Sequence, residues 1–224
     1  MKQINIIIAE RDRDDCLSVC LHHLDIANSG KLYNVIVYVV SDRRSTLVHC
    51  ENIYVFMYYF PTLTKYFNKA ALLNYGLEVM VPDFDWLSIV DVDMMYNPKF
   101  FNTIDMNISD RSYLVSTGTQ LSNGDVYPGA SQISISRTVY ELFQNIYGET
   151  LYCEDFEGWG GEDSDLSLKS IDMKKEDLID RRVISDMWIH RNHEKRHENE
   201  DYTRQLFEKR RITNKEILRR WLEK

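Results

Sequence analysis

The stretch Asp85-Trp-Leu-Ser-Ile-Val-Asp-Val-Asp93 is a short apolar run that ends in two carboxylates one residue apart. We expect the run to form a buried strand, because short apolar runs of this kind are typical of central strands. Side chains alternate along a strand, so Asp91 and Asp93 should leave on one side while Val92 turns into packing. Like charges a few Å apart repel unless a cation or hydrogen-bond donors meet them. The pair indicates a divalent metal, although aspartate is also common where a strand enters a turn.

Strand-like and helix-like segments alternate around this stretch. The pattern predicts strands at residues 4–9, 33–40, 53–60, 113–117 and 132–136, and helices that include residues 17–24, 68–79, 138–148 and 162–171. This alternation favours an α/β fold with a mixed, mostly parallel central sheet flanked by helices. Ligands of such sheets bind beyond the carboxyl ends of the strands, where Arg11, Arg13, Asp91 and Asp93 should gather. We place one domain at residues 1–200 and a C-terminal appendage at 201–224.

The composition narrows the class of protein. The 224 residues carry a net charge of −8, which argues against a general nucleic-acid binder. The four cysteines form no Cys-x-x-Cys pair and are expected to be free thiols in a reducing compartment. No apolar run approaches the roughly 18 residues that span a bilayer, and the start of the sequence lacks a signal-peptide pattern. We therefore expect a soluble, cytoplasmic protein.

The block Gly158-Trp-Gly-Gly-Glu-Asp-Ser-Asp165 places three glycines around a tryptophan, followed by three acids at the start of a helical pattern. Glycines allow the backbone to approach a ligand closely, and Trp159 offers a flat surface on which a sugar can stack. Acids in a first helical turn also satisfy free N–H groups and the helix dipole. Helix capping is therefore the alternative interpretation, but it requires neither the tryptophan nor the glycines.

The segment Trp188-Ile-His-Arg-Asn-His193 places two histidines three residues apart. Neutral imidazoles at this spacing can share a cation, with Mn²⁺ a suitable choice. A plain surface pair is the alternative. The polar residues 191–201 follow directly, and we expect them to close over a bound ligand.

Five blocks in this order resemble the metal-dependent, inverting glycosyltransferases of the GT-A fold. The similarity is greatest to the β-1,4-galactosyltransferase group and the related bacterial chondroitin-type enzymes, and it covers residues 4 to about 200. The most specific block is Gly158-Trp-Gly-Gly-Glu-Asp163. The others are Glu10-Arg-Asp-Arg13, Phe67-Asn-Lys-Ala-Ala-Leu-Leu-Asn-Tyr-Gly76, Asp91-Val-Asp93 and His190-x-x-His193.

This resemblance implies a donor site for a UDP-sugar and a bound Mn²⁺, or Mg²⁺ in its place. Asp93 would be a metal ligand and His193 a second one, while His190 stands where the galactosyltransferases have a methionine ligand. Arg11 and Arg13 would contact the nucleotide. The remaining residues implied at the nucleotide-sugar site are Lys69, Asp91, Val92, Trp159, Gly160 and Gly161.

The resemblance also implies a saccharide acceptor, with Asp163 as the general base and Glu162 beside it holding the acceptor. A carboxylate that accepts the proton of a sugar hydroxyl makes that hydroxyl a competent nucleophile. The sequence departs from the family at Lys69, where an arginine is usual, and at Ser164, which replaces an acid. We also expect it to be without the membrane anchor and stem of the animal enzymes.

Two other functions compete with this interpretation. A metal-dependent phosphohydrolase or nucleotidyltransferase gathers similar side chains, and a non-catalytic carbohydrate-binding domain could use Trp159. The segment 202–224 is basic and amphipathic. We expect it to pack on the domain, with docking on an anionic membrane or a partner enzyme as the alternative.

Overall fold

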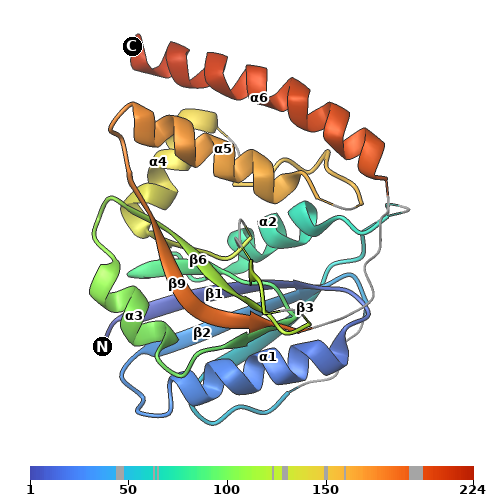
Figure 1. Cartoon of the computed structure of the whole chain (residues 1–224), viewed down its shortest axis with the longest axis vertical. Helices are drawn as coiled ribbons and strands as arrows, with labels where there is room; N and C mark the ends of the chain where they lie inside the picture. The colour runs from blue at the N-terminus through green and yellow to red at the C-terminus, as the bar shows by residue number, and fades with distance from the viewer. Residues whose placement is uncertain are drawn as a thin grey trace.

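The computed structural model describes residues 1–43, 48–62, 64, 66–122, 124–127, 131–148, 151–158, 160–191 and 199–224. Its strands form one mixed sheet with helices on both faces (Figure 1). The strands are β1 (Gln3–Glu10), β2 (Asn34–Ser41), β3 (Tyr54–Tyr59), β4 (Trp86–Ile89), β5 (Met94–Tyr96), β6 (Ser112–Gln120), β7 (Val126–Tyr127), β8 (Ile133–Ser136) and β9 (Asp180–His190).

The sheet order is β3-β2-β1-β4-β8-β6-β9-β5, with β7 paired to β6. The half from β3 to β4 is parallel, and β6 and β9 are also parallel. The other pairings, which include the short β5 and β8, are antiparallel. Most paired residues thus lie in parallel pairs, which confirms the mixed, mostly parallel sheet that the sequence predicts.

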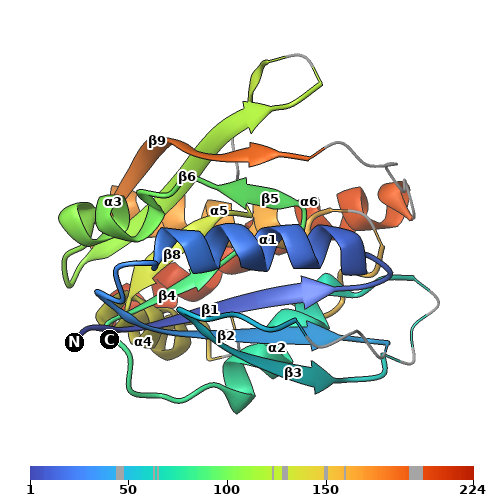
Figure 2. The same cartoon turned by 90° about the horizontal axis from the view of Figure 1, so that it is seen from below.

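The described part of the chain contains six helices, five of which cover the two faces of this sheet. They are α1 (Asp14–Ala27), α2 (Lys69–Val79), α3 (Phe100–Asn107), α4 (Arg137–Tyr147), α5 (Glu162–Lys175) and α6 (Glu200–Leu222). Helices α1 and α3 cover one face, while α2, α4 and α5 cover the other (Figures 1 and 2). Helix α6 lies outside α4 and α5, which makes an additional layer.

The position of β1 between two layers of helices explains why its sequence is mostly apolar. Ile6 and Ile8 point into the core beneath α1, whereas Ile7 points into the core beneath α2. Because successive side chains alternate and both faces are covered, apolar residues are favoured along the strand, and the buried Asn5 is accommodated by donating a hydrogen bond to the Val81 carbonyl. The fully buried strand is a rigid support for the polar residues that follow it.

The acidic stretch differs from the sequence prediction in one respect. Strand β4 ends at Ile89, and Asp91 and Asp93 lie in the turn between β4 and β5 rather than in the strand. Pairing stops here because the Asp91 N–H donates to the side-chain Oε1 of Gln132, at 3.1 Å, instead of to a neighbouring strand backbone. The side chain of Val92 is buried, as the alternation predicts.

Strand β9 is an element that the sequence analysis missed. It runs parallel to β6 with a register shift between Ser116 and Gly118. A Cβ added to Gly118 would lie 2.0 Å from the backbone oxygen of Trp188, so only glycine permits this approach. Strand β9 ends at His190, which pairs with Met94 of β5 and is thereby brought beside the acidic turn.

The C-terminal segment packs on the domain, as expected. Leu218 of α6 is buried in the same core cluster as residues of α2 and α4. Asn214 donates a 2.8 Å hydrogen bond to Asp165 of α5. No helix in the described ranges has the length and apolar character that crossing a membrane requires. The boundary at residue 200 and a contact of α6 with a membrane or partner remain predictions.

Candidate active site

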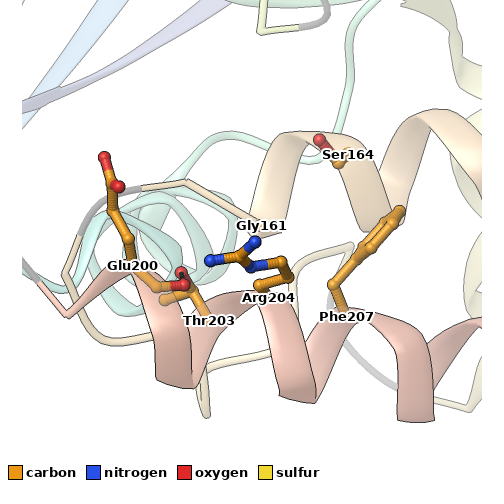
Figure 3. Close-up of a pocket in the computed structure, with 6 residues that line it drawn as sticks. All are labelled: Gly161, Ser164, Glu200, Thr203, Arg204 and Phe207. Carbon is orange, nitrogen blue, oxygen red and sulfur yellow. Dashed lines mark hydrogen bonds between the residues drawn. The ribbon is translucent and has the colours of Figure 1, made fainter. Parts of the chain in front are cut away.

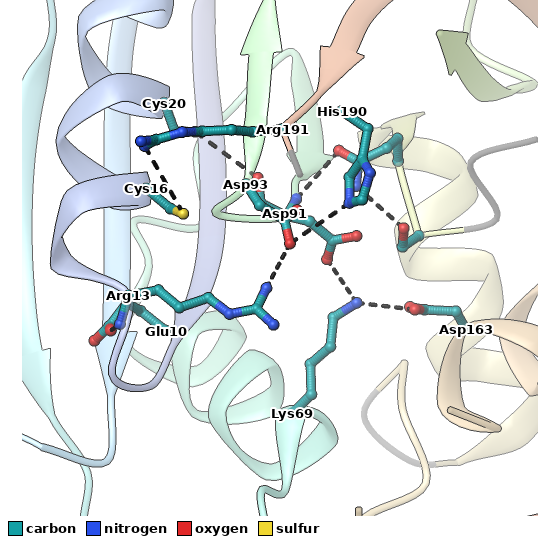
Figure 4. Close-up of polar contacts among 12 residues, drawn as sticks. Glu10, Arg13, Cys16, Cys20, Lys69, Asp91, Asp93, Asp163, His190 and Arg191 are labelled. Atoms are coloured by element: carbon teal, nitrogen blue, oxygen red, sulfur yellow. Dashed lines mark hydrogen bonds and ion pairs between the residues drawn. The ribbon is translucent and has the colours of Figure 1, made fainter. Parts of the chain in front are cut away.

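Charged side chains from four parts of the chain meet beyond the carboxyl ends of β1 and β4 (Figure 4). Arg13 follows β1, Asp91 and Asp93 follow β4, and Lys69 begins α2. Asp163 enters from the first turn of α5. The arrangement brings the paired acids and the glycine-rich block, which are about 70 residues apart in sequence, to one place.

Asp93 lies between a guanidinium group and an imidazole. Its Oδ2 is 2.5 Å from Nη1 of Arg13 and 3.8 Å from Nε2 of His190. The backbone N–H of Arg191 donates to the Asp93 carbonyl at 2.9 Å, which fixes the turn against the end of β9. The carboxylate is largely buried, so these neighbours act with little screening by water.

A buried glutamate shapes the loop that carries Arg13. Glu10 is 1% exposed, and its carboxylate accepts hydrogen bonds from the Arg13 backbone N–H at 2.7 Å and from Ser41 Oγ at 2.6 Å. Arg11 instead forms an ion pair with Asp42 at 3.2 Å. Burial raises the pKa of Asp42, and Arg11 partly counteracts the rise. The structure thus brings Arg13, but not Arg11, to the paired acids.

Lys69 joins the acidic turn to the start of α5. Its ammonium nitrogen is 2.7 Å from Asp91 Oδ1, 2.8 Å from Asp163 Oδ2 and 3.8 Å from Glu162 Oε1. Burial alone would lower the pKa of Lys69, but the three carboxylates outweigh it and raise the pKa well above its ordinary value. Lys69 is therefore a permanent cation at the centre of the site.

The two acids at the start of α5 have unequal surroundings. Burial, reinforced by the Asp163 charge, raises the pKa of Glu162 to about 8. Burial also raises the pKa of Asp163, but the ammonium group of Lys69 opposes this rise. Because Asp163 is 1 Å closer to Lys69 than Glu162 is (2.8 against 3.8 Å), it is the better placed of the two to stay ionised.

The glycines before these acids form a tight turn. Gly160 and Gly161 have φ angles of +76° and +100°, a region that other residues rarely adopt. A Cβ on Gly161 would also lie 2.5 Å from the ring of Phe156. The N–H of Gly158 donates to the Phe67 carbonyl at 2.9 Å, which ties this turn to the segment before Lys69. Trp159 lies outside the described residues.

Two asparagines hold α2 against residues 152–154, which precede the glycine-rich block, and the sequence analysis assigned neither of them a role. Asn68 caps α2 by accepting from the Ala71 N–H at 2.9 Å, and its amide donates to the Glu154 carbonyl at 2.8 Å. Asn74 is buried and exchanges hydrogen bonds with the backbone of Tyr152. A polar residue on the apolar face of a predicted helix was the signal that could have identified Asn74.

A pocket of about 370 Å³ opens beside the first turn of α5 (Figure 3). Gly161 and Ser164 form its α5 wall, and the first turns of α6 form the other. The α6 residues that line it are Glu200, Thr203, Arg204 and Phe207. An aromatic ring, a hydroxyl and opposite charges thus line a pocket whose other wall includes Ser164, the residue after Asp163. This lining suits a ligand that is polar but has an apolar face.

The proposed metal ligands are only partly assembled by the described residues. Asp93 and His190 are adjacent, whereas His193 lies outside the described ranges together with most of the segment expected to close over a ligand. Within those ranges, no three potential metal ligands of the His, Cys, Asp and Glu types cluster together. Carboxylate oxygen and imidazole nitrogen are nevertheless ligand types that suit Mn²⁺.

No protein-family model matches the chain. Among curated proteins, β-1,4-galactosyltransferase 4 of Mus musculus is 25% identical over 174 residues, which cover 75% of this chain and 42% of that protein. The protein of the same name from Cricetulus griseus is 24% identical over the same shares. The match therefore spans less than half the length of these relatives.

Solved structures share the fold. The catalytic domain of Drosophila β1,4-galactosyltransferase 7, bound to xylobiose, has a TM-score of 0.58 and 17% identity and covers 91% of this chain and 80% of its own. S. aureus TarS 1–349 in complex with UDP-GlcNAc has a TM-score of 0.61 and 16% identity, and the match covers 99% of this chain and 72% of the TarS chain. The chain thus has the GT-A fold that its sequence blocks suggested.

Proposed function

We propose that this chain is a metal-dependent glycosyltransferase that moves a sugar from a UDP-sugar to a saccharide hydroxyl with inversion. The observation that carries the proposal is the position of Lys69, which contacts both Asp91 on the donor side and Asp163 on the acceptor side. Proteins of similar fold support the choice of substrates. The Drosophila enzyme has been determined with manganese, UDP-Gal and xylobiose, and a mycobacterial synthase with Mn²⁺ and UDP-glucose.

The donor side is suited to a leaving diphosphate. Arg13 supplies a guanidinium group, which binds phosphate oxygens through paired N–H donors. Asp93 and His190 would hold the cation, with His193 as the further ligand that the sequence suggests. A bound Mn²⁺ would neutralise the charge that develops on the diphosphate as the glycosidic bond breaks. Because Arg13 contacts Asp93 here, we expect it to move toward phosphate when donor and metal bind.

The acceptor side contains the proton acceptor. The acceptor oxygen attacks the anomeric carbon while the bond from that carbon to the phosphate oxygen breaks, and UDP leaves with the electron pair. The hydroxyl proton passes to the Asp163 carboxylate. Glu162, whose pKa is about 8, keeps its proton at neutral pH and can donate a hydrogen bond to the acceptor. We place the acceptor sugar at the pocket between α5 and α6, where Phe207 offers an apolar face.

A panel of UDP-Gal, UDP-GlcNAc and UDP-Glc, each with and without Mn²⁺, tests the proposal. A ligand that binds only the folded protein raises its melting temperature, so the cognate donor should stabilise the protein only when Mn²⁺ is present. Saccharide acceptors, xylobiose among them, are then added, and NMR of the product reports whether the anomeric centre is inverted. If the donor is hydrolysed at the same rate whether or not an acceptor is present, the result would instead support a phosphohydrolase. If the protein binds glycans equally well with and without nucleotide, the result would support a carbohydrate-binding domain.

A further inference from the structure

One ammonium group faces three carboxylates at the junction of α2, α5 and the acidic turn. The side chain of Lys69 is 14% exposed, and that of Glu162 is 7% exposed. A single positive charge cannot neutralise three acids whose side chains are at most 22% exposed, so the cluster would carry surplus negative charge if all three were ionised. Such a surplus is relieved when one acid keeps its proton.

The distances decide which acid that is. Lys69 is within hydrogen-bonding distance of Asp91 and Asp163, at 2.7 and 2.8 Å, whereas its 3.8 Å separation from Glu162 is too long for a hydrogen bond. Burial and the neighbouring Asp163 charge raise the pKa of Glu162 to about 8. Glu162 thus keeps the proton, and Asp163 stays free to accept one.

We propose that Lys69 is a positioning residue for the transfer reaction: its ammonium group keeps Asp163 ionised and holds it beside the donor-side acid Asp91. This inference rests on the proposed function, because it assigns Asp163 the role of proton acceptor. Lys69 keeps its own proton throughout and does not touch the reacting atoms. The residue therefore links the charge state of the acceptor side to the geometry of the donor side.

The other groups near Asp163 do not provide this charge. Asp91 is an acid whose charge raises the pKa of Asp163, and Glu162, which keeps its proton, carries no charge and lowers that pKa only through a hydrogen bond. Tyr152 and Tyr113 also lie close by, and burial raises the pKa of both phenols, so they remain neutral. Among the described residues that face Asp163, the positive charge comes from Lys69.

Lys69→Met tests the proposal because it keeps an unbranched side chain and removes the charge. Without the ammonium group, burial and the neighbouring acids should raise the pKa of Asp163. A base works only above its pKa, so the acidic limb of the transfer rate against pH should move upward by at least about one pH unit. At a fixed pH on that limb, the rate should then fall about tenfold for each pH unit that the limb moves. Lys69→Arg, which restores the residue usual in the resembling family, should return the limb toward its wild-type position.

A second measurement needs no substrate. The ¹³C carboxyl resonance of Asp163, assigned by its disappearance in Asp163→Asn, reports ionisation of this group directly. Its titration midpoint should rise in Lys69→Met and remain near wild type in Lys175→Met, which removes an exposed lysine that pairs with Asp172 further along α5. If Lys69→Met does not fold, Lys69→Gln provides the same loss of charge with a polar side chain.

The outcomes separate this inference from the proposed function. An unmoved Asp163 midpoint in folded Lys69→Met protein overturns the role of Lys69. So does a rate that falls equally at every pH, because that is what a purely structural role produces. A raised midpoint in a protein whose wild type transfers no sugar would support the control of Asp163 ionisation by Lys69 and would refute the glycosyltransferase assignment.

Discussion

Arg13 and Asp93 form an ion pair between the loop after β1 and the turn after β4, with His190 on the same carboxylate oxygen. An arginine and a metal ion cannot both occupy that oxygen without rearrangement. In this structure the guanidinium group of Arg13 therefore binds the Asp93 carboxylate, which we propose as a metal ligand. Binding of a metal and a nucleotide should exchange these partners.

Asp93→Ala should therefore abolish the dependence of UDP binding on Mn²⁺. Calorimetric titration of UDP with and without Mn²⁺ measures the effect, and the far-UV circular dichroism spectrum reports whether the fold survives. Asp83→Ala is the matched control, because Asp83 is an exposed acid that pairs with Arg137 outside the site. UDP binding by Asp93→Ala that is as tight as wild type in the presence of Mn²⁺ would remove Asp93 from the metal site.

Asp163→Asn should reduce turnover while leaving donor affinity nearly unchanged. The amide keeps the shape of the side chain but cannot accept the hydroxyl proton, and general-base catalysis contributes about 10²–10⁴-fold. Loss of kcat without loss of donor binding is expected for an interaction made in the transition state. Steady-state kinetics at saturating donor measure the loss, with Asp83→Asn as control. Normal turnover together with a loss of about 1 kcal/mol in the free energy of unfolding, as expected when a helix cap is removed, would favour the helix-capping interpretation.

Glu162 should make stability depend on pH. Its pKa of about 8 in the folded protein exceeds the ordinary glutamate value, so the folded state binds more protons than the unfolded state between about pH 4.5 and 8. Wild-type stability should fall as pH rises through this range and level off above it. Glu162→Gln carries no charge at either end of the range.

The variant should therefore gain stability relative to wild type as pH rises, on the order of 2–4 kcal/mol between pH 5 and 8.5. Urea unfolding at both pH values measures the difference. Glu141→Gln, which changes an exposed acid of α4, should show little pH-dependent difference from wild type. A constant offset between Glu162→Gln and wild type at all pH values would mean that Glu162 ionises normally.

Local sequence patterns predicted the parallel half of the sheet because each of its strands is a mostly apolar run. They also identified the acids and the glycine-rich block. They did not predict β9, which begins with three charged residues and is interrupted by Asp186, a residue with a φ of +59°. Its pairing with β6 depends on the close approach of Gly118 to Trp188. A contact between residues so far apart in sequence produces no periodic pattern that could be recognised locally.

Local sequence patterns were equally unable to predict which residues of the site lie together. Asp91 and Asp163 were each recognised from their neighbours in sequence, but their connection through Lys69 requires α2 and α5 to begin at the same place. The pocket needs α6 as its second wall, and the sequence identified that segment only as amphipathic. Side-chain types predicted the chemistry, whereas tertiary packing determined which residues act together.

Asn214 of α6 should contribute to stability through a buried polar contact. Its amide donates to Asp165 Oδ1 at 2.8 Å, and the other oxygen of Asp165 is 3.1 Å from the Lys169 ammonium group. All three residues are at most 3% exposed. Removing one donor from a buried carboxylate costs about 1.5–3 kcal/mol, because the lost hydrogen bond cannot be replaced by water.

Asn214→Ala should therefore lower the melting temperature by about 3–12 °C for a protein of this size. The adjacent exposed residue gives the control, since Lys215→Ala should change stability by less than about 0.5 kcal/mol. Removal of residues 205–224 should cost more, because it also withdraws Leu218 from the core. Metal-dependent binding of UDP should persist in every variant that remains folded, because Arg13, Asp93 and His190 lie outside α6. If Asn214→Ala has the same melting temperature as wild type, the contact between α5 and α6 does not stabilise the fold. If a folded truncation loses UDP binding, α6 is part of the donor site.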